Sequence, residues 1–216
     1  MPGKTRMRVR LHDADNGPND APCGYATWGE VEDYTLRLIG KDLCGPIDYL
    51  SLKAQNIAGE YVDLGTNGTI IVTSEFDDAN SDTQDIGFSF PFHCDTFSSF
   101  VLNTNGFIRL GDAPPSKPGL YFDTPRDSYG GIFNSNDPAD ANILAPMNIN
   151  LDAGAGNAEY RVHTSGDAPY RVCTIQFKDV REAGTDPVPQ FDNMEFQIKL
   201  YESTGVIEYV YGDWTP

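Results

Sequence analysis

The chain has 216 residues, 39% of them hydrophobic, and its 32 acidic residues outnumber 15 basic ones, which gives a net charge of −17. Nucleic acids and anionic membrane surfaces both attract basic proteins, so this charge excludes both as partners. No apolar run approaches the roughly 20 residues of a membrane-spanning helix, and no signal-peptide core follows Met1. We therefore expect an acidic chain, part of a longer gene product, without membrane insertion.

Breaking residues and aromatic residues together predict the fold class. Gly (21) and Pro (15) make up one sixth of the chain, while Phe, Tyr and Trp account for 12%. Short β-branched and aromatic runs separated by breakers are typical of all-β proteins, and the aromatic content is too high for disorder. No long stripe has the 3.6-residue period of a helix. The expected fold is an antiparallel β-sandwich with a short β segment at the N-terminus.

The first forty residues form one unit. In residues 6–12, three apolar residues alternate with three arginines, which is the period of a half-buried strand, and residues 34–39 predict a second strand. The stretches TRMRVRL, PCG and GEVEDYTLRL resemble the closing portion of the GEVED domain. That β-sandwich module occurs in large secreted and cell-surface proteins of Bacteroidetes-type bacteria. The resemblance implies that residues 1–40 are the C-terminal part of a GEVED-like module.

Residues 41–48 contain Gly and Pro and are expected to be a linker, after which residues 49–216 form a β-sandwich domain. Asn105-Gly106 stands between two apolar runs, which predicts a hairpin tip with positive φ at the asparagine. Asn67-Gly68 predicts a second turn of this kind. The expected strands are residues 69–73, 85–92, 97–110 folded at the hairpin, 143–151, 159–162, 171–177, 194–200 and 206–211.

The second domain resembles a β-sandwich from the same secreted bacterial proteins. The resemblance rests on GFSFPF, SFVLNTNGFIRLG, ILAPMNINLDAG, APYRVCTIQF and FQIKLYESTGVIEYVYG, in that order. It implies an extracellular domain that commonly precedes a C-terminal type IX secretion sorting domain. A looser similarity to the nidogen-type extracellular domain rests on the NGF hairpin, Ala145-Pro146 and Asp152. Neither family supplies catalytic residues that transfer to this chain.

The four cysteines are Cys23, Cys44, Cys94 and Cys173, and no two of them form a CxxC pair. The spacing therefore gives no support for a zinc site. In an oxidising compartment three disulfide pairings are open. Cys173 lies inside an apolar strand run, so a free buried thiol is the alternative for this residue.

An acidic loop near the N-terminus is the candidate metal site. Asp13, Asp15, Asn19 and Asp20 place oxygen side chains around Gly17, as a loop does when it wraps a hard cation. Calcium takes six to eight oxygen ligands and tolerates a flexible loop, so calcium is the candidate ion. A solvated turn is the alternative, because no bidentate glutamate follows as in an EF-hand.

Two further groups of carboxylates also have two interpretations. Residues 77–85 form a second acidic loop, which either holds calcium or is solvated. Glu30, Glu32 and Asp33 are possible ligands too, but the arginines of residues 6–10 form a rare basic concentration on a neighbouring strand. We expect these three carboxylates to pair with the arginines.

The longest expected loop, residues 112–142, is the candidate ligand-binding site. Loops of this length in a compact domain are usually functional or mobile. Its aromatic rings are suited to stacking on sugars, or alternatively to closing the end of the sandwich as plugs. The candidate ligand-binding residues are Tyr121, Phe122, Tyr129 and Phe133; Trp28 and Trp214 lie in or beside other loops.

No motif brings a catalytic set together. The three histidines are far apart, and neither a GxSxG elbow nor an HExxH pair is present. The expected function is a non-catalytic module of a large secreted or cell-surface protein, serving adhesion, spacing or display. Its expected partners are other domains of the same polypeptide and surface glycans or proteins. The alternatives are an accessory module of a secreted metalloprotease or glycosidase, and a carbohydrate-binding module.

Overall fold

The computed structural model describes residues 3–12, 29–38, 54–120, 135, 137–147, 149–154, 156, 158–183 and 190–216. The chain divides into two compact units, Met1–Asp48 and Tyr49–Pro216. Strands dominate these ranges, in which the one helical element is a 3-10 turn, η5 (Pro138–Asp140). No helix within them has the length and apolar character needed to cross a membrane. The predicted all-β class is confirmed.

The first unit contains one antiparallel pair, β1 (Gly3–His12) and β2 (Gly29–Leu38). The sequence pattern predicts a strand only from residue 34, whereas β2 begins five residues earlier and includes the whole GEVED stretch. Acidic residues have low strand propensity, but continuous pairing with β1 overrides it. The acidic stretch therefore lies on a strand and not in the connecting loop.

The register of this pair bears on the expected charge pairing. Asp33 lies directly opposite Arg8, the arrangement that a cross-strand ion pair needs. Glu30 and Glu32 lie opposite apolar residues of β1, at positions that alternate with the arginines. Of the three carboxylates, Asp33 alone has an arginine across from it.

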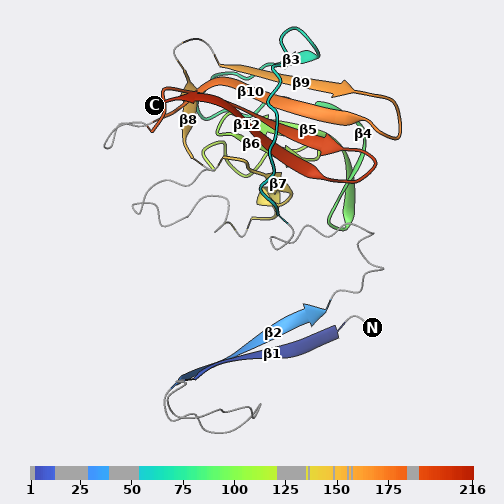
Figure 1. Ribbon diagram of the computed structural model, residues 1–216, viewed down its shortest axis with the longest axis vertical. Helices are drawn as coiled ribbons and strands as arrows, with labels where there is room; N and C mark the ends of the chain where they lie inside the picture. Colours follow the sequence, from blue (N-terminus) through green and yellow to red (C-terminus); the bar gives the residue numbers. More distant parts are fainter. Residues whose placement is uncertain are drawn as a thin grey trace. The chain divides into compact units, whose positions relative to one another are not determined.

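The second unit is a sandwich of two antiparallel sheets (Figure 1). The larger sheet has the order β12-β11-β10-β9-β3, and β8 pairs with the end of β10 beyond β9. The smaller sheet has the order β4-β5-β6-β7. The strands are β3 (Thr69–Ile71), β4 (Gln84–Phe92), β5 (Asp95–Asn103), β6 (Phe107–Leu110), β7 (Ile143–Leu144), β8 (Leu151–Ala153), β9 (Glu159–Ser165), β10 (Val172–Glu182), β11 (Asn193–Tyr201) and β12 (Ile207–Thr215).

One predicted strand is wrong. Residues 143–151 are predicted as a single strand but form two, β7 and β8, which belong to different sheets. Proline has no N–H to donate to a ladder, and Pro146 follows β7 closely, so the pairing of β7 with β6 stops there. The chain then crosses from the smaller sheet to the larger one, where β8 pairs with β10.

The hairpin at the Asn-Gly pair is present, but its turn differs from the predicted one. Strands β5 and β6 pair as far as Asn103 opposite Phe107, which leaves a three-residue loop. A two-residue turn would place both Asn105 and Gly106 at positive φ. Here Gly106 has φ +82°, while Asn105 is not among the non-glycine residues with positive φ. The extra loop residue places the left-handed conformation on the glycine alone.

The core lies between the sheets and follows the period-two alternation of the strands. Strand β4 buries every second residue from Ile86 to Phe92. From the larger sheet, Phe177 and Phe196 are fully buried, and their rings stack with centroids 4.6 Å apart. Burying each such side chain stabilises the fold by about 1.5–3 kcal/mol. The two inner faces together form the main core of the unit.

Residues 59–64, which we call the strap, cross the outer face of the larger sheet (Figure 1). Gln176 and Gln197 are fully buried beneath it. Nε2 of Gln197 donates to the carbonyl of Val62 at 2.7 Å and to Oε1 of Gln176 at 2.8 Å. The N–H of Leu64 donates to the same Gln176 oxygen at 3.0 Å. Polar side chains of the sheet thus replace the backbone ladder in holding the strap.

Two of the four cysteines are described. Cys94 is disulfide-bonded, whereas Cys23 and Cys44 lie outside the described residues. Cys173 is a free thiol buried in the core, as the alternative interpretation predicts. Burial raises the pKa of Cys173 to about 12, so its thiol stays protonated at neutral pH.

Candidate functional site

The ligands of the first candidate calcium loop and the candidate sugar-stacking residues lie outside the described part of the chain. They are the candidate calcium ligands Asp13, Asp15, Asn19 and Asp20, and the candidate sugar-stacking residues Tyr121, Phe122, Tyr129 and Phe133. Both sets stay predictions. Within the described ranges, no three His, Cys, Asp or Glu side chains are grouped in a way that could hold a metal ion.

The second acidic loop, residues 77–85, is described, and its polar side chains serve separate parts of the fold. Oδ1 of Asp78 accepts a hydrogen bond from Nδ2 of Asn105 at 2.9 Å. Oδ1 of Asn80 accepts one from an asparagine of β5 at 2.6 Å, and Oδ1 of Asp85 accepts the N–H of Gly87 at 2.8 Å. Because each oxygen has a different partner, these contacts favour a structural turn over a calcium loop.

Negative charge is concentrated around Asp77 in this loop. Partial burial raises the pKa of Asp77, and the nearby charges of Asp78 and Asp152 raise it further. Tyr160, which is buried, also has a raised pKa, mainly through burial and secondarily through the charges of Asp152 and Asp77. Arg181 offsets part of this charge through an ion pair with Asp152 at 3.0 Å.

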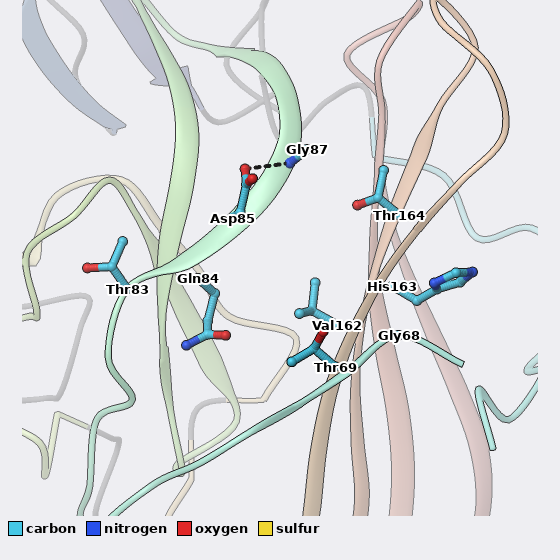
Figure 2. Close-up of a pocket in the computed structure, with 9 residues that line it drawn as sticks. All are labelled: Gly68, Thr69, Thr83, Gln84, Asp85, Gly87, Val162, His163 and Thr164. Atoms are coloured by element: carbon cyan, nitrogen blue, oxygen red, sulfur yellow. Dashed lines mark hydrogen bonds between the residues drawn. The ribbon is translucent and has the colours of Figure 1, made fainter. Parts of the chain in front are cut away.

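A pocket lies between β4 of the smaller sheet and the β3–β9 edge of the larger one (Figure 2). Its volume is about 410 Å³. The lining residues are Gly68, Thr69, Thr83, Gln84, Asp85, Gly87, Val162, His163 and Thr164. They come from three segments that are distant in the sequence, so no local sequence motif predicts the pocket.

Two glycines allow the close contacts beside this pocket. A Cβ on Gly68 would lie 2.1 Å from the carbonyl oxygen of Val162, and Gly68 also has φ +73°. Only glycine meets both conditions. A Cβ on Gly87 would lie 3.1 Å from the side chain of Thr164, whose hydroxyl donates to the carbonyl of Ile86 at 2.8 Å. This hydrogen bond joins β9 of the larger sheet to β4 of the smaller one.

The polar side chains that line the pocket make their hydrogen bonds within the fold. The hydroxyls of Thr83 and Thr164 donate to backbone carbonyls, and Asp85 accepts a backbone N–H. The ring of His163 points away from Asp85 and Gln84 in Figure 2. An activated nucleophile needs a base within hydrogen-bond reach, and among these described side chains no hydrogen bond links such a pair.

The hairpin tip carries a polar cluster that the sequence analysis missed: Asn103, Thr104 and Asn105 are all fully buried. Oδ1 of Asn105 accepts the N–H of Leu151 at 2.9 Å, while its Nδ2 donates to Asp78. The two partners lie 46 and 27 residues away in the chain. One asparagine therefore joins the hairpin to the start of β8 and to the acidic loop.

Its two neighbours extend the same cluster. The hydroxyl of Thr104 accepts the N–H of Ala79 at 2.9 Å, and the N–H of Thr104 donates to the carbonyl of Ala79 at 3.0 Å. Nδ2 of Asn103 donates to the carbonyl of Pro118 at 3.0 Å. A signal was available in the sequence, because three polar residues before a glycine interrupt an apolar run. A turn signal alone, however, does not distinguish exposed polar residues from buried ones.

Known protein families match both units of the chain. The GEVED domain matches residues 1–37, and a family described as NIDO related matches residues 51–215, which is more than half of the chain. The chain belongs to the NIDO-related family. The resemblances to the GEVED domain and to a nidogen-like domain are confirmed. No curated protein and no solved structure matches the chain.

The NIDO-related domain contains both the pocket and the buried polar cluster, because both fall within residues 51–215. GEVED and NIDO-related domains are typically non-catalytic. Together they indicate an extracellular accessory module within a larger polypeptide.

Proposed function

We propose that the chain is a non-catalytic part of a large secreted or cell-surface bacterial protein, in which it serves adhesion, spacing or display. The observation that carries the proposal is the tandem of a GEVED match at residues 1–37 and a NIDO-related match at residues 51–215. The described polar groups support it, because the pocket and the hairpin cluster use their hydrogen bonds within the fold.

Activity on substrates tests this proposal directly. The whole chain is incubated with a panel of peptide and glycoside substrates, and no turnover is expected. Asp85 is the exposed carboxylate of the pocket, so Asp85→Asn is the control variant. Reproducible turnover that Asp85→Asn or another single Asp or Glu substitution abolishes would overturn the proposal in favour of an enzyme.

The rival within the same class is an accessory module of a secreted metalloprotease or glycosidase. The composition of the parent gene separates the two. An upstream HExxH domain or glycosidase domain favours the accessory role, whereas a long array of repeats favours adhesion. A C-terminal sorting domain in the same gene would support export by type IX secretion.

Calcium binding belongs to the proposal as well. If Asp13, Asp15, Asn19 and Asp20 hold calcium, chelation lowers the Tm, because an ion that binds only the native state stabilises that state. Magnesium should replace calcium poorly, since it requires a tighter octahedral site. A metal-stripped sample that gives neither heat nor a thermal shift on calcium titration removes this element.

A further inference from the structure

The sequence Thr-Asn-Gly occurs at two turns of the second unit, as Thr66-Asn67-Gly68 and as Thr104-Asn105-Gly106. The side-chain amide of an asparagine that precedes glycine is prone to attack by the next backbone nitrogen, because glycine has no side chain to hinder the approach. Both asparagines have the same neighbour on each side, so their intrinsic reactivity should be closely similar. A difference between them in the folded chain therefore comes from the structure.

Asn105 and the nitrogen that would attack it are both held in place. Asn105 is fully buried, its Oδ1 accepts the N–H of Leu151, and its Nδ2 donates to Asp78. The N–H of Gly106 donates to the carbonyl of Asn103 at 3.2 Å. A Cβ on Gly106 would lie 2.8 Å from the side chain of Leu151, so the backbone is closely packed here. The two reacting groups cannot approach each other without breaking these contacts.

The corresponding groups at Asn67 are not held. Asn67 is exposed, and within the described residues its side chain makes no hydrogen bond. The backbone of Asn67 is fixed by its N–H, which donates to the carbonyl of Leu64 at 2.8 Å. In the same part of the chain no hydrogen bond engages the N–H of Gly68. The amide of Asn67 can therefore swing towards this nitrogen without breaking a hydrogen bond.

We propose that Asn67 is a site of spontaneous deamidation and that the fold protects Asn105 from the same reaction. The nitrogen of Gly68 attacks the side-chain carbonyl carbon of Asn67, and an N–C bond forms. The bond from this carbon to the amide nitrogen breaks, and ammonia leaves with the proton of the Gly68 N–H, which gives a cyclic imide. Water then opens the imide at either carbonyl to give aspartate or isoaspartate. The net reaction consumes one water and releases one ammonia, and it does not depend on the proposed function.

The isoaspartate product changes the connection between the strap and β3. Its backbone runs through the former side chain and is longer by one carbon. Gly68 has little room to absorb this length, because a Cβ there would lie 2.1 Å from the carbonyl oxygen of Val162. On the other side of the turn, the N–H of Leu64 is fixed to Gln176 at 3.0 Å. We therefore expect the conversion to weaken the attachment of the strap.

The test follows both Thr-Asn-Gly peptides in the folded whole chain during incubation in mildly alkaline buffer. Peptide mapping by chromatography and mass spectrometry detects the gain of one mass unit and separates isoaspartate from aspartate. Asn67 should convert at least about tenfold faster than Asn105, since about 1.4 kcal/mol of additional barrier slows a reaction tenfold and Asn105 must first leave two hydrogen-bond partners. In urea the two should convert at similar rates. Asn67→Gln is the matched variant and should stay unchanged, because its longer side chain closes a ring more slowly.

The proposal is overturned if Asn67 stays intact in the folded chain while it converts in urea. It is also overturned if Asn67 and Asn105 convert at the same rate in the folded chain. Amide hydrogen exchange tests the consequence for the strap, since the N–H of Leu64 should exchange faster in the isoaspartate form than in Asn67→Gln. Equal exchange in the two proteins would refute the expected weakening.

Discussion

Replacing Asn105 by alanine should destabilise the second unit more than its position in a turn suggests. The side chain is fully buried and makes two hydrogen bonds at 2.9 Å, to Leu151 and Asp78. Alanine leaves the buried N–H of Leu151 without an acceptor, which costs about 1–3 kcal/mol. Asp78 is exposed, so water replaces the hydrogen bond that its carboxylate loses, at little cost in free energy. With the small cavity left by the amide, the free energy of unfolding should fall by about 2–4 kcal/mol.

Urea unfolding followed by circular dichroism measures this change, provided that the slope of the transition is the same for both proteins. For a unit of this size, about 2–4 kcal/mol corresponds to a Tm lower by about 5–15 °C. Asn67→Ala is the matched control, because Asn67 also precedes a glycine in a turn but is exposed. Its effect should stay within about 0.5 kcal/mol. Equal stabilities of Asn105→Ala and Asn67→Ala would refute the role assigned to the buried cluster.

Three other predictions concern single positions. Gly68→Ala should lower the free energy of unfolding, measured in urea, by at least about 2 kcal/mol, because Gly68 has a positive φ and an added Cβ would clash with a backbone oxygen. Gly156→Ala is the control and should have little effect, because a Cβ there would have nothing within 4 Å. Cys173 should stay unmodified by iodoacetamide at pH 8 in the folded chain and react in urea, since burial raises its pKa to about 12; peptide mapping that finds it alkylated under native conditions would contradict this. The hydrogen bond from Lys178 lowers the pKa of Asp63 from 3.8 to about 2, so this carboxylate stabilises the fold above about pH 4 and ceases to do so as the pH falls towards 2. Asp63→Asn should therefore lower stability at pH 7 by less than about 1 kcal/mol, because the pair is partly exposed, and should match the parent at pH 2; a difference that persists at pH 2 would count against it.

The sequence predicts the strands of the second unit well, because their apolar residues alternate. The alternation of β4 is visible in the sequence and matches its burial. In β11 the burial departs from the alternation, because Gln197 on the outer face is buried beneath the strap. The prediction from alternation fails for residues 143–151, where one apolar run is divided between strands of two different sheets. The sequence shows which residues are apolar but not which strands they pair with. The Asn105-Gly106 pair predicts the hairpin because it is a turn sequence between two apolar runs, but the length of its loop depends on the register of the strands.

The candidate sites depend on contacts between distant segments, and local patterns carry little information about these. The sequence predicts Asn105 as a turn residue, yet its hydrogen bonds to Asp78 and Leu151 make it part of the core. The sequence places Trp214 in or beside a loop, and only the β-bulge in β12 puts it on the same face of the strand as Tyr211. The pocket likewise combines three segments whose residues are ordinary in the sequence. The spacing of apolar residues along the chain predicts strands. The candidate sites form only where strands and loops that are distant in the sequence come into contact.

The strap gives the second unit a mechanical property. Residues 59–64 are held to the outer face by separate contacts from Gln197, Gln176 and Lys178 and not by a strand ladder. A pulling force applied from the N-terminal side reaches these contacts before it reaches the sheets, and it breaks them one after another. Six residues span at most about 20 Å when fully extended, which is the upper limit of the length that the strap can release. The core between the sheets does not depend on these contacts, so in a protein under tension we expect the strap to detach from the sheet before the sandwich unfolds.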